Sequence, residues 1–228
     1  MNASGGTRWR GYARVVRFRD RHEAGERLAD ALEESAVLRP ADRPLILGVP
    51  RGGVPVAAVI SDRLGAELDV LVAHKLGAPG NPEFAIGAVA EDGTTILDTQ
   101  LIERYGISGD YVERETRSQR AEVERRAKLL RSGRSPIPVT GRICIVTDDG
   151  VATGSTLEVS LRLVLNAGAD RVIAAIPVGP PATINRLEGI VDAVVCPMQP
   201  ATFFAVGAWY ENFGQVSDKT VIDLLGSR

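Results

Sequence analysis

Short apolar runs, each joined to a turn and a helical pattern, recur along the chain and limit its possible folds more than any other feature. Strands of a parallel sheet appear as such runs because helices cover both faces of the sheet. The runs lie at residues 45–49, 68–74, 142–146, 171–178 and 192–196. This order of elements predicts parallel βαβ units and an α/β fold with a doubly wound, mainly parallel sheet that has helices on both faces.

Helical patterns separate these runs. Asp20 and Glu23 form a capping-box pattern at the start of an amphipathic helix that continues to about Ser35. Further helices are predicted over residues 54–65, 154–168 and 182–188.

A long segment between the second and third runs interrupts this pattern. Gly and Pro residues after Lys75 precede two short β-like pieces, at residues 84–90 and 94–97. A charged stretch from Ser108 to Arg131 then predicts a long, largely solvated helix. Because acidic residues interrupt its arginines, we expect no nucleic-acid patch there. We therefore expect a single domain over residues 1–228 with an inserted region at residues 77–134.

Charge and cysteine usage narrow the class of protein. The formal net charge is −2, from 27 basic and 29 acidic residues, so no overall positive field attracts nucleic acid or an anionic membrane. Cys144 and Cys196 lie in apolar runs, where we expect buried, unpaired thiols, as in a reducing cytosol. The N-terminal residues lack the apolar stretch of a secretory signal, and no run is long enough to span a bilayer. These features predict a cytoplasmic protein.

The loop after the third run concentrates polar groups. Asp148 and Asp149 follow the strand, and the small residues Ala152, Thr153, Gly154, Ser155 and Thr156 begin the next helix. Ligands of open α/β sheets bind at the carboxyl ends of strands, and a helix start with free N–H groups attracts phosphate. Two adjacent carboxylates repel each other unless a cation or ligand hydroxyls bridge them. The loop is therefore predicted to bind a ribose phosphate with Mg²⁺, an ordinary strand-to-helix turn being the alternative.

This segment, ICIVTDDGVATGSTL, resembles the phosphoribosyl pyrophosphate (PRPP) motif of the type I phosphoribosyltransferase family and fits neither GxxxxGK[ST] nor GxGxxG. The resemblance implies that Asp148 and Asp149 hold the ribose hydroxyls and, through these or water, Mg²⁺, while residues 152–156 cradle the 5-phosphate. Gly150 replaces the larger apolar residue that is usual in the family and is expected to loosen the turn. Ala152 is typical of adenine enzymes, so a 6-oxopurine acceptor is disfavoured.

A second landmark, PRGG at residues 50–53, stands where the family has its pyrophosphate loop. Gly52 and Gly53 allow backbone N–H groups to turn toward an anion, and Arg51 can add a charge-assisted bond to the leaving pyrophosphate. The resemblance also implies that Lys75 is the basic residue that lies over the pyrophosphate, whereas His74 is expected to be a satisfied histidine at the core edge. Together with the acidic pair, Arg51 and Lys75 are the candidate catalytic residues.

The stretch FFAVG, residues 203–207, resembles the segment with which purine-type members of the family stack the base. It implies base binding by Phe204, with Trp209 or Tyr210 as neighbours, and leaves aromatic core packing as an equal alternative. The inserted region matches the family's flexible hood, which closes over PRPP.

The resemblance thus implies a Mg²⁺-dependent enzyme that transfers ribose 5-phosphate from PRPP to a nitrogenous acceptor and releases pyrophosphate. A PRPP-binding regulator without transferase activity is the alternative. A sugar-phosphate hydrolase would need a nucleophile or a metal cluster, and the sequence shows no such constellation. The acceptor, the general base and the oligomeric state, including a homo-oligomer, are left open.

Overall fold

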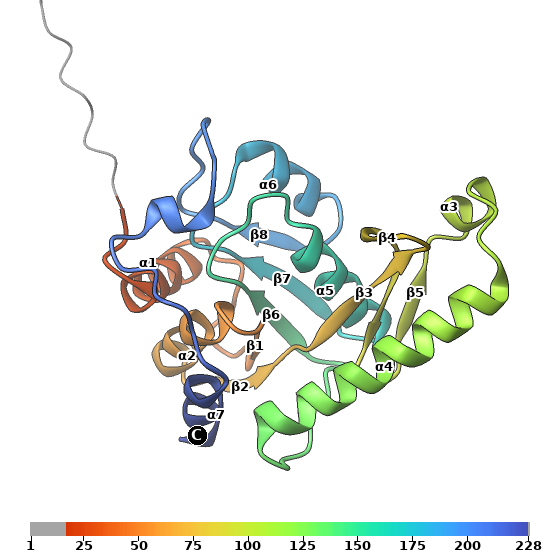
Figure 1. Ribbon diagram of the computed structural model, residues 1–228. Helices are drawn as coiled ribbons and strands as arrows, with labels where there is room; N and C mark the ends of the chain where they lie inside the picture. The colour runs from red at the N-terminus through yellow and green to blue at the C-terminus, as the bar shows by residue number, and fades with distance from the viewer. Residues whose placement is uncertain (1–16, 228) are drawn as a thin grey trace, which may run out of the picture.

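The computed structural model describes residues 17–227, so expectations that rest on the first sixteen residues lie outside it. A five-stranded parallel sheet, in the order β2-β1-β6-β7-β8, forms its centre (Figure 1). Its strands are β1 (Leu45–Gly48), β2 (Glu67–Val70), β6 (Ile143–Thr147), β7 (Arg171–Ala175) and β8 (Ala193–Val195). The prediction of a doubly wound, mainly parallel sheet is confirmed.

Helices cover both faces of this sheet. Alternate strand residues enter two apolar clusters, so that Ile145 packs with α1, α2 and α7 on one face while Val146 packs with α5 and α6 on the other. Burial on both faces explains why the strands are continuous apolar runs. The helices are α1 (Arg21–Glu34), α2 (Gly53–Leu64), α3 (Thr99–Arg104), α4 (Gly109–Arg131), α5 (Ser155–Asn166), α6 (Pro181–Glu188) and α7 (Asp218–Gly226), with a short 3-10 helix at Val206–Trp209.

A second, antiparallel sheet stands beside the first, in the order β3-β4-β5 (Figure 1). It consists of β3 (Ala73–Ala78), β4 (Asn81–Ala90) and β5 (Thr95–Leu97). The prediction of a single strand over residues 68–74 is wrong, because this stretch is divided between the two sheets. Parallel pairing ends at Gly48 and Val70, where β1 itself ends, and the chain then enters β3.

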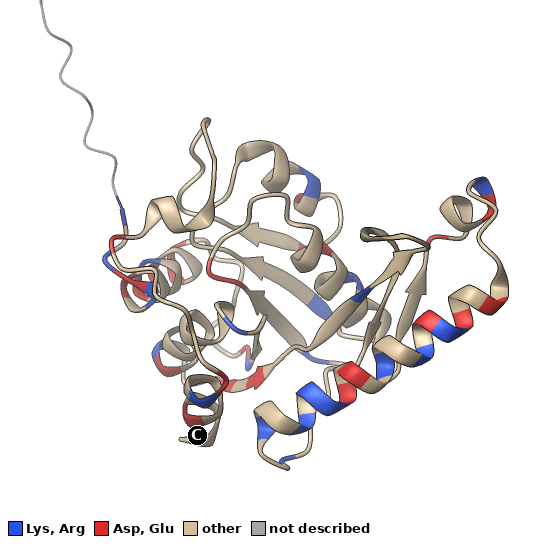
Figure 2. Cartoon of the chain, in the orientation of Figure 1, with Lys and Arg blue, Asp and Glu red and all other residues tan. Residues whose placement is uncertain are grey.

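The long helix predicted from Ser108 to Arg131 is confirmed as α4, which Ser108 caps through the N–H of Tyr111. Acidic and basic residues both occur along it (Figure 2). At its end, Arg131 is buried and donates to Asp69 Oδ1 (2.7 Å), to the Val70 carbonyl oxygen (2.7 Å) and to the Glu91 carboxylate. Arg131 therefore fixes α4 to both sheets, a role that sequence analysis missed because it considered apolar anchors alone.

Both cysteines are free, with Cys144 buried and Cys196 half-buried. Burial raises the pKa of Cys144 to about 11 and that of Cys196 to about 12. Across residues 17–227, no helix combines the length and apolarity that crossing a membrane requires.

Candidate functional site

The two loops singled out by the sequence meet where the strand order of the parallel sheet reverses. β1 and β6 are neighbours, yet β1 continues into α2 on one face and β6 into α5 on the other. A crevice at the carboxyl ends of such strands is the usual ligand site of open α/β sheets. Residues 50–53 and residues 148–156 both lie at this crevice.

Gly52 and Gly53 bring the two loops into contact. A Cβ atom on Gly52 would overlap Asp149 Oδ2 and lie 2.6 Å from its Cγ, and one on Gly53 would lie 2.8 Å from Asp148 Cα and 2.5 Å from the Thr147 carbonyl oxygen. Because these distances are too short for any real side chain, the approach requires glycine. The Pro50–Arg51 peptide bond in this loop is cis. The structure thus places PRGG directly against the acidic pair.

Asp148 and Asp149 lie side by side, and the Asp149 N–H donates to Asp148 Oδ1 (2.8 Å). Burial raises the pKa of both carboxyl groups, and the charge of Asp149 raises the pKa of Asp148 further. Arg21 opposes the rise at Asp149, since its Nε and Nη2 atoms each lie 2.8 Å from Oδ2. The pair therefore favours a ligand that supplies hydroxyl donors or a cation.

Arg21 is a site residue that sequence analysis missed. Asp20 accepts a bond from the Glu23 N–H (3.0 Å) and so fixes the first turn of α1, where Arg21 lies. Arg21 Nη1 also donates to the Gly214 carbonyl oxygen (2.8 Å), and its guanidinium carbon lies 4.0 Å from the centre of the Phe213 ring. These partners are far away in sequence, so no local motif announces the contact.

The turn after the acidic pair is tightly packed. Gly150 has φ of 152°, and a Cβ atom there would lie 2.6 Å from Val206 Cγ1 and 3.0 Å from Val178 Cγ1. The expectation that Gly150 loosens the turn is therefore wrong, because neighbouring valines fill the space. The Tyr210 hydroxyl also donates to the Asp149 carbonyl oxygen.

The start of α5 has the features of an anion cradle. Gly154 is the N-cap residue, and no side chain of the described residues caps the helix. Thr153 Oγ1 and Ser155 Oγ lie 3.3 Å apart, and Thr156 is exposed. Uncapped N–H groups beside hydroxyls suit a phosphate at a helix N-terminus.

Side chains of helix α6 fix the backbone of this cradle. Thr183 Oγ1 donates to the Ala152 carbonyl oxygen (2.7 Å), and Arg186 Nη2 donates to the carbonyl oxygen of Thr153. Since side chains of α6 bind the carbonyl groups of the loop, the N–H groups and hydroxyls of the loop are left for a ligand.

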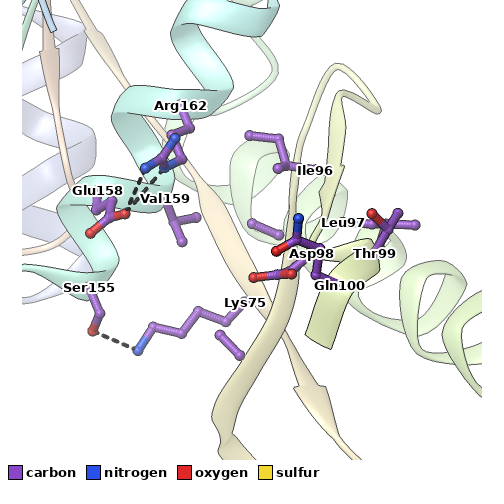
Figure 3. A pocket seen from close by; sticks show the side chains of 13 residues that line it. Lys75, Ile96, Leu97, Asp98, Thr99, Gln100, Ser155, Glu158, Val159 and Arg162 are labelled. Atoms are coloured by element: carbon purple, nitrogen blue, oxygen red, sulfur yellow. Dashed lines mark hydrogen bonds and ion pairs between the residues drawn. The ribbon is translucent and has the colours of Figure 1, made fainter. Parts of the chain in front are cut away.

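Lys75 reaches the cradle from the second sheet. Its Nζ atom lies 3.1 Å from Ser155 Oγ, at one end of a cleft of about 570 Å³ between α5 and residues 96–100 (Figure 3). Glu158 and Arg162 line the α5 wall of this cleft. Lys75 therefore lies against the cradle predicted for the 5-phosphate, and its place over pyrophosphate stays a prediction. His74 Nδ1 is 3.1 Å from Gln119 Oε1, as expected of a satisfied histidine.

The aromatic residues predicted to lie at a base differ from one another in exposure and packing. Phe204 is 89% exposed. Trp209 stacks on Phe203, with ring centroids 6.1 Å apart, and Tyr210 is buried against Phe18. Packing thus accounts for Trp209 and Tyr210, and base binding by Phe204 or Trp209 stays a prediction.

The acidic pair fits Mg²⁺ that arrives with a phosphate ligand. Within residues 17–227, His, Cys, Asp and Glu form no group of three or more that could hold a metal ion. Mg²⁺ commonly binds one or two carboxylates and keeps waters or substrate phosphates as its other ligands. Arg21 occupies Asp149 Oδ2, and the Asp149 N–H donates to Asp148 Oδ1, which leaves Asp149 Oδ1 and Asp148 Oδ2 for such an ion or for hydroxyl groups.

A family model and curated relatives point to one family. Residues 20–210 match the phosphoribosyl transferase domain. A protein found in two strains of Mycobacterium tuberculosis, CDC 1551 and H37Rv, and named provisionally as a phosphoribosyl transferase, is 43% identical over 208 residues. That match covers 91% of this chain and 46% of the relative, so the chain spans about half the relative's length. The crystal structure of TT1426 from Thermus thermophilus is 44% identical, with a TM-score of 0.83, and the match covers 92% of this chain and 97% of that one.

Proposed function

Because the chain belongs to the phosphoribosyl transferase domain family, we propose that it transfers ribose 5-phosphate from PRPP to a nitrogenous acceptor and releases pyrophosphate. The observation that carries this proposal is the contact of Gly52 and Gly53 with Asp148 and Asp149. Through it, groups suited to ribose hydroxyls, to a 5-phosphate and to a diphosphate surround one crevice.

The acidic pair and the cradle are proposed to fix the ribose. Asp148 and Asp149 Oδ1 accept bonds from the 2- and 3-hydroxyl groups, while residues 152–156 bind the 5-phosphate through N–H groups and hydroxyls. Bonds at both ends of the sugar set the direction from which the acceptor nitrogen approaches the anomeric carbon. The adjacent carboxylates also favour the positive charge that develops on the ribose ring as pyrophosphate leaves.

Arg51 and Lys75 are proposed to neutralise the negative charge of the phosphates. Arg51 belongs to the loop assigned to the leaving pyrophosphate, and Lys75 stands at the cradle. The acidic pair would hold Mg²⁺, which would supply further positive charge to stabilise the leaving group. The protein then contributes position and electrostatic stabilisation, without a covalent intermediate.

The second sheet, with α3 and α4, is proposed to act as the hood, because Lys75 on β3 already touches the phosphate cradle. Closure of this region would shield the reaction from water.

The free thiols of Cys144 and Cys196 suit a reducing compartment, and we propose that the protein acts in the cytoplasm.

The acceptor is proposed to be adenine-like or a reactive amine. Ala152 lies on the exposed side of the loop and offers no carboxylate to hold a proton of the acceptor. Hypoxanthine and guanine are therefore expected to be poor acceptors.

The test is pyrophosphate release from PRPP and Mg²⁺ with a set of bases and amines, using the full chain and its Asp148→Asn variant. We expect release with an adenine-like or amine acceptor and a large loss of rate in the variant. Binding of PRPP at micromolar concentration without release for any acceptor would favour the regulator instead. A chain that does not bind PRPP would refute both functions, and rapid turnover of guanine would refute the role given to Ala152.

A further inference from the structure

Two arginines from separate elements converge on one carboxylate beside the PRGG loop. Arg51 Nη1 lies 3.6 Å from Asp218 Oδ1, and Arg126 Nη2 lies 3.7 Å from the same oxygen. Arg51 belongs to the loop after β1, Arg126 to the last third of α4, and Asp218 is the first residue of α7. Helices α4 and α7 are in contact at this corner of the molecule (Figure 1).

The carboxylate of Asp218 is poorly bonded in this position. Its Oδ1 atom is buried and has no hydrogen-bond partner among the described residues. Both distances to the arginines exceed those of ordinary hydrogen bonds, so charge alone holds the oxygen there. The side chains of Arg51 and Asp218 are each 36% exposed, and an ion pair this open contributes little to stability. A ligand of higher charge can therefore displace Asp218 easily.

The local charge balance favours an anion. Glu122, one turn before Arg126 on α4, already accepts two bonds of 2.7 Å from Arg125. Within the described residues, Asp218 is thus the acid that Arg51 and Arg126 share as ion-pair partners. Because Glu122 also attracts Arg126 and Asp218 also attracts Arg125, the cluster sets three guanidinium groups against two carboxylates, which leaves an excess of positive charge.

We propose that Asp218 holds the place of an anion in the ligand-free chain and that the diphosphate of PRPP displaces it, binding Arg51 and Arg126 together. This proposal rests on the function proposed above and adds Arg126 as a second pyrophosphate-binding residue. A diphosphate has two phosphoryl groups, each able to take a guanidinium group through paired bonds, whereas one carboxylate oxygen cannot satisfy both arginines. Binding of the leaving group thereby acts on α4, which packs on the second sheet.

The experiment is calorimetric titration of the full chain with inorganic pyrophosphate in the presence of Mg²⁺. We expect Arg126→Gln to weaken binding about tenfold, as for the loss of a hydrogen bond to a charged group. Asp218→Asn is expected to tighten binding by about threefold or more, because the ligand no longer has to displace a competing carboxylate. Affinity for ribose 5-phosphate should stay unchanged in both variants.

Two variants serve as matched controls. Arg120→Gln changes another arginine of α4, which is bonded to Glu124 at 3.0 Å, and Asp223→Asn removes an acid of α7 that is paired with Lys219 at 2.6 Å. Both should bind pyrophosphate as the wild type does.

Opposite effects of Arg126→Gln and Asp218→Asn cannot arise from misfolding, which would weaken binding in both. Unchanged affinity in Arg126→Gln, or weaker binding in Asp218→Asn, would overturn the inference while leaving the proposed function intact, provided that the wild type binds PRPP. A wild-type chain that binds neither PRPP nor pyrophosphate would refute the proposed function, and the inference with it.

Discussion

Replacing Arg21 by glutamine removes the cation that faces the acidic pair from α1. Two of its nitrogen atoms lie 2.8 Å from Asp149 Oδ2, and a third donates to the Gly214 carbonyl oxygen. Without Arg21, the strongest opposition to the burial-driven rise in the pKa of Asp149 would be lost, and the C-terminal segment would lose its bond to α1. We expect lower stability as a result.

The burial of the pair sets the size of this effect. The side chains of Arg21 and Asp149 are 13% and 12% exposed. Breaking a fully buried pair by removing one partner costs about 3–5 kcal/mol, whereas exposed pairs contribute about 0–1 kcal/mol. This mostly buried pair should therefore contribute about 2–3 kcal/mol, which for a chain of this length lowers Tm by about 4–12 °C.

Thermal unfolding of purified variants measures this loss, with Arg27→Gln as the matched control. Arg27 lies on the same helix and pairs with Glu23, but its side chain is 40% exposed, so its removal should cost about 1 kcal/mol or less. The double variant Arg21→Gln with Asp149→Asn should lose at least about 1 kcal/mol less than the sum of the single losses, because the partners are coupled. Equal Tm values for Arg21→Gln and Arg27→Gln, or additive losses, would refute this account of Arg21.

Three further predictions concern the packing of the loops, the second sheet and the thiols. Gly53→Ala should lower stability by about 2 kcal/mol or more in denaturant unfolding, since its Cβ would meet the backbone of Thr147 and Asp148, while Gly109→Ala, with open space at its Cβ position, should be nearly neutral. Residues 77–95 should be cut by protease in the free chain and protected by PRPP with Mg²⁺; identical cleavage in both states would argue against a closing hood. At pH 8 the pH lies below the raised pKa values of Cys144, about 11, and Cys196, about 12, so both thiols stay protonated and iodoacetamide should label them after unfolding only; labelling of the native chain would contradict these raised pKa values.

The parallel sheet and its loops could be predicted because their signals are local. Continuous apolar runs mark strands buried on both faces, and the carboxyl ends of neighbouring strands meet at one edge of the sheet. Asp149 and Gly52 thus come together as expected from the order of elements. By contrast, the stretch at residues 68–74 is apolar apart from Asp69 and His74, and nothing in its pattern shows that pairing ends where β1 ends.

Contacts between distant elements could not be predicted from the sequence. Arg21 is an ordinary polar residue of an amphipathic helix, and its importance appears once α1 lies beside the turn at Asp149. Arg131 looks like part of a solvated basic tail, yet it is buried between the two sheets. Similarly, Val206 fills the space above Gly150, so a residue expected to loosen the turn lies in a tight one. Each of these outcomes depends on side chains that tertiary packing alone brings together.

Calorimetric titration of Asp148→Asn and Asp149→Asn with PRPP and Mg²⁺ tests the central claim most directly. Burial and the neighbouring charge raise the pKa of Asp148, so its carboxylate is unfavourable for folding, and Asp148→Asn should be at least as stable as the wild type. Both variants should nevertheless bind PRPP about tenfold or more weakly, as expected when a charged acceptor of hydroxyl groups is lost. Wild-type affinity for PRPP in the folded variants would contradict the assignment of the acidic pair to the ribose.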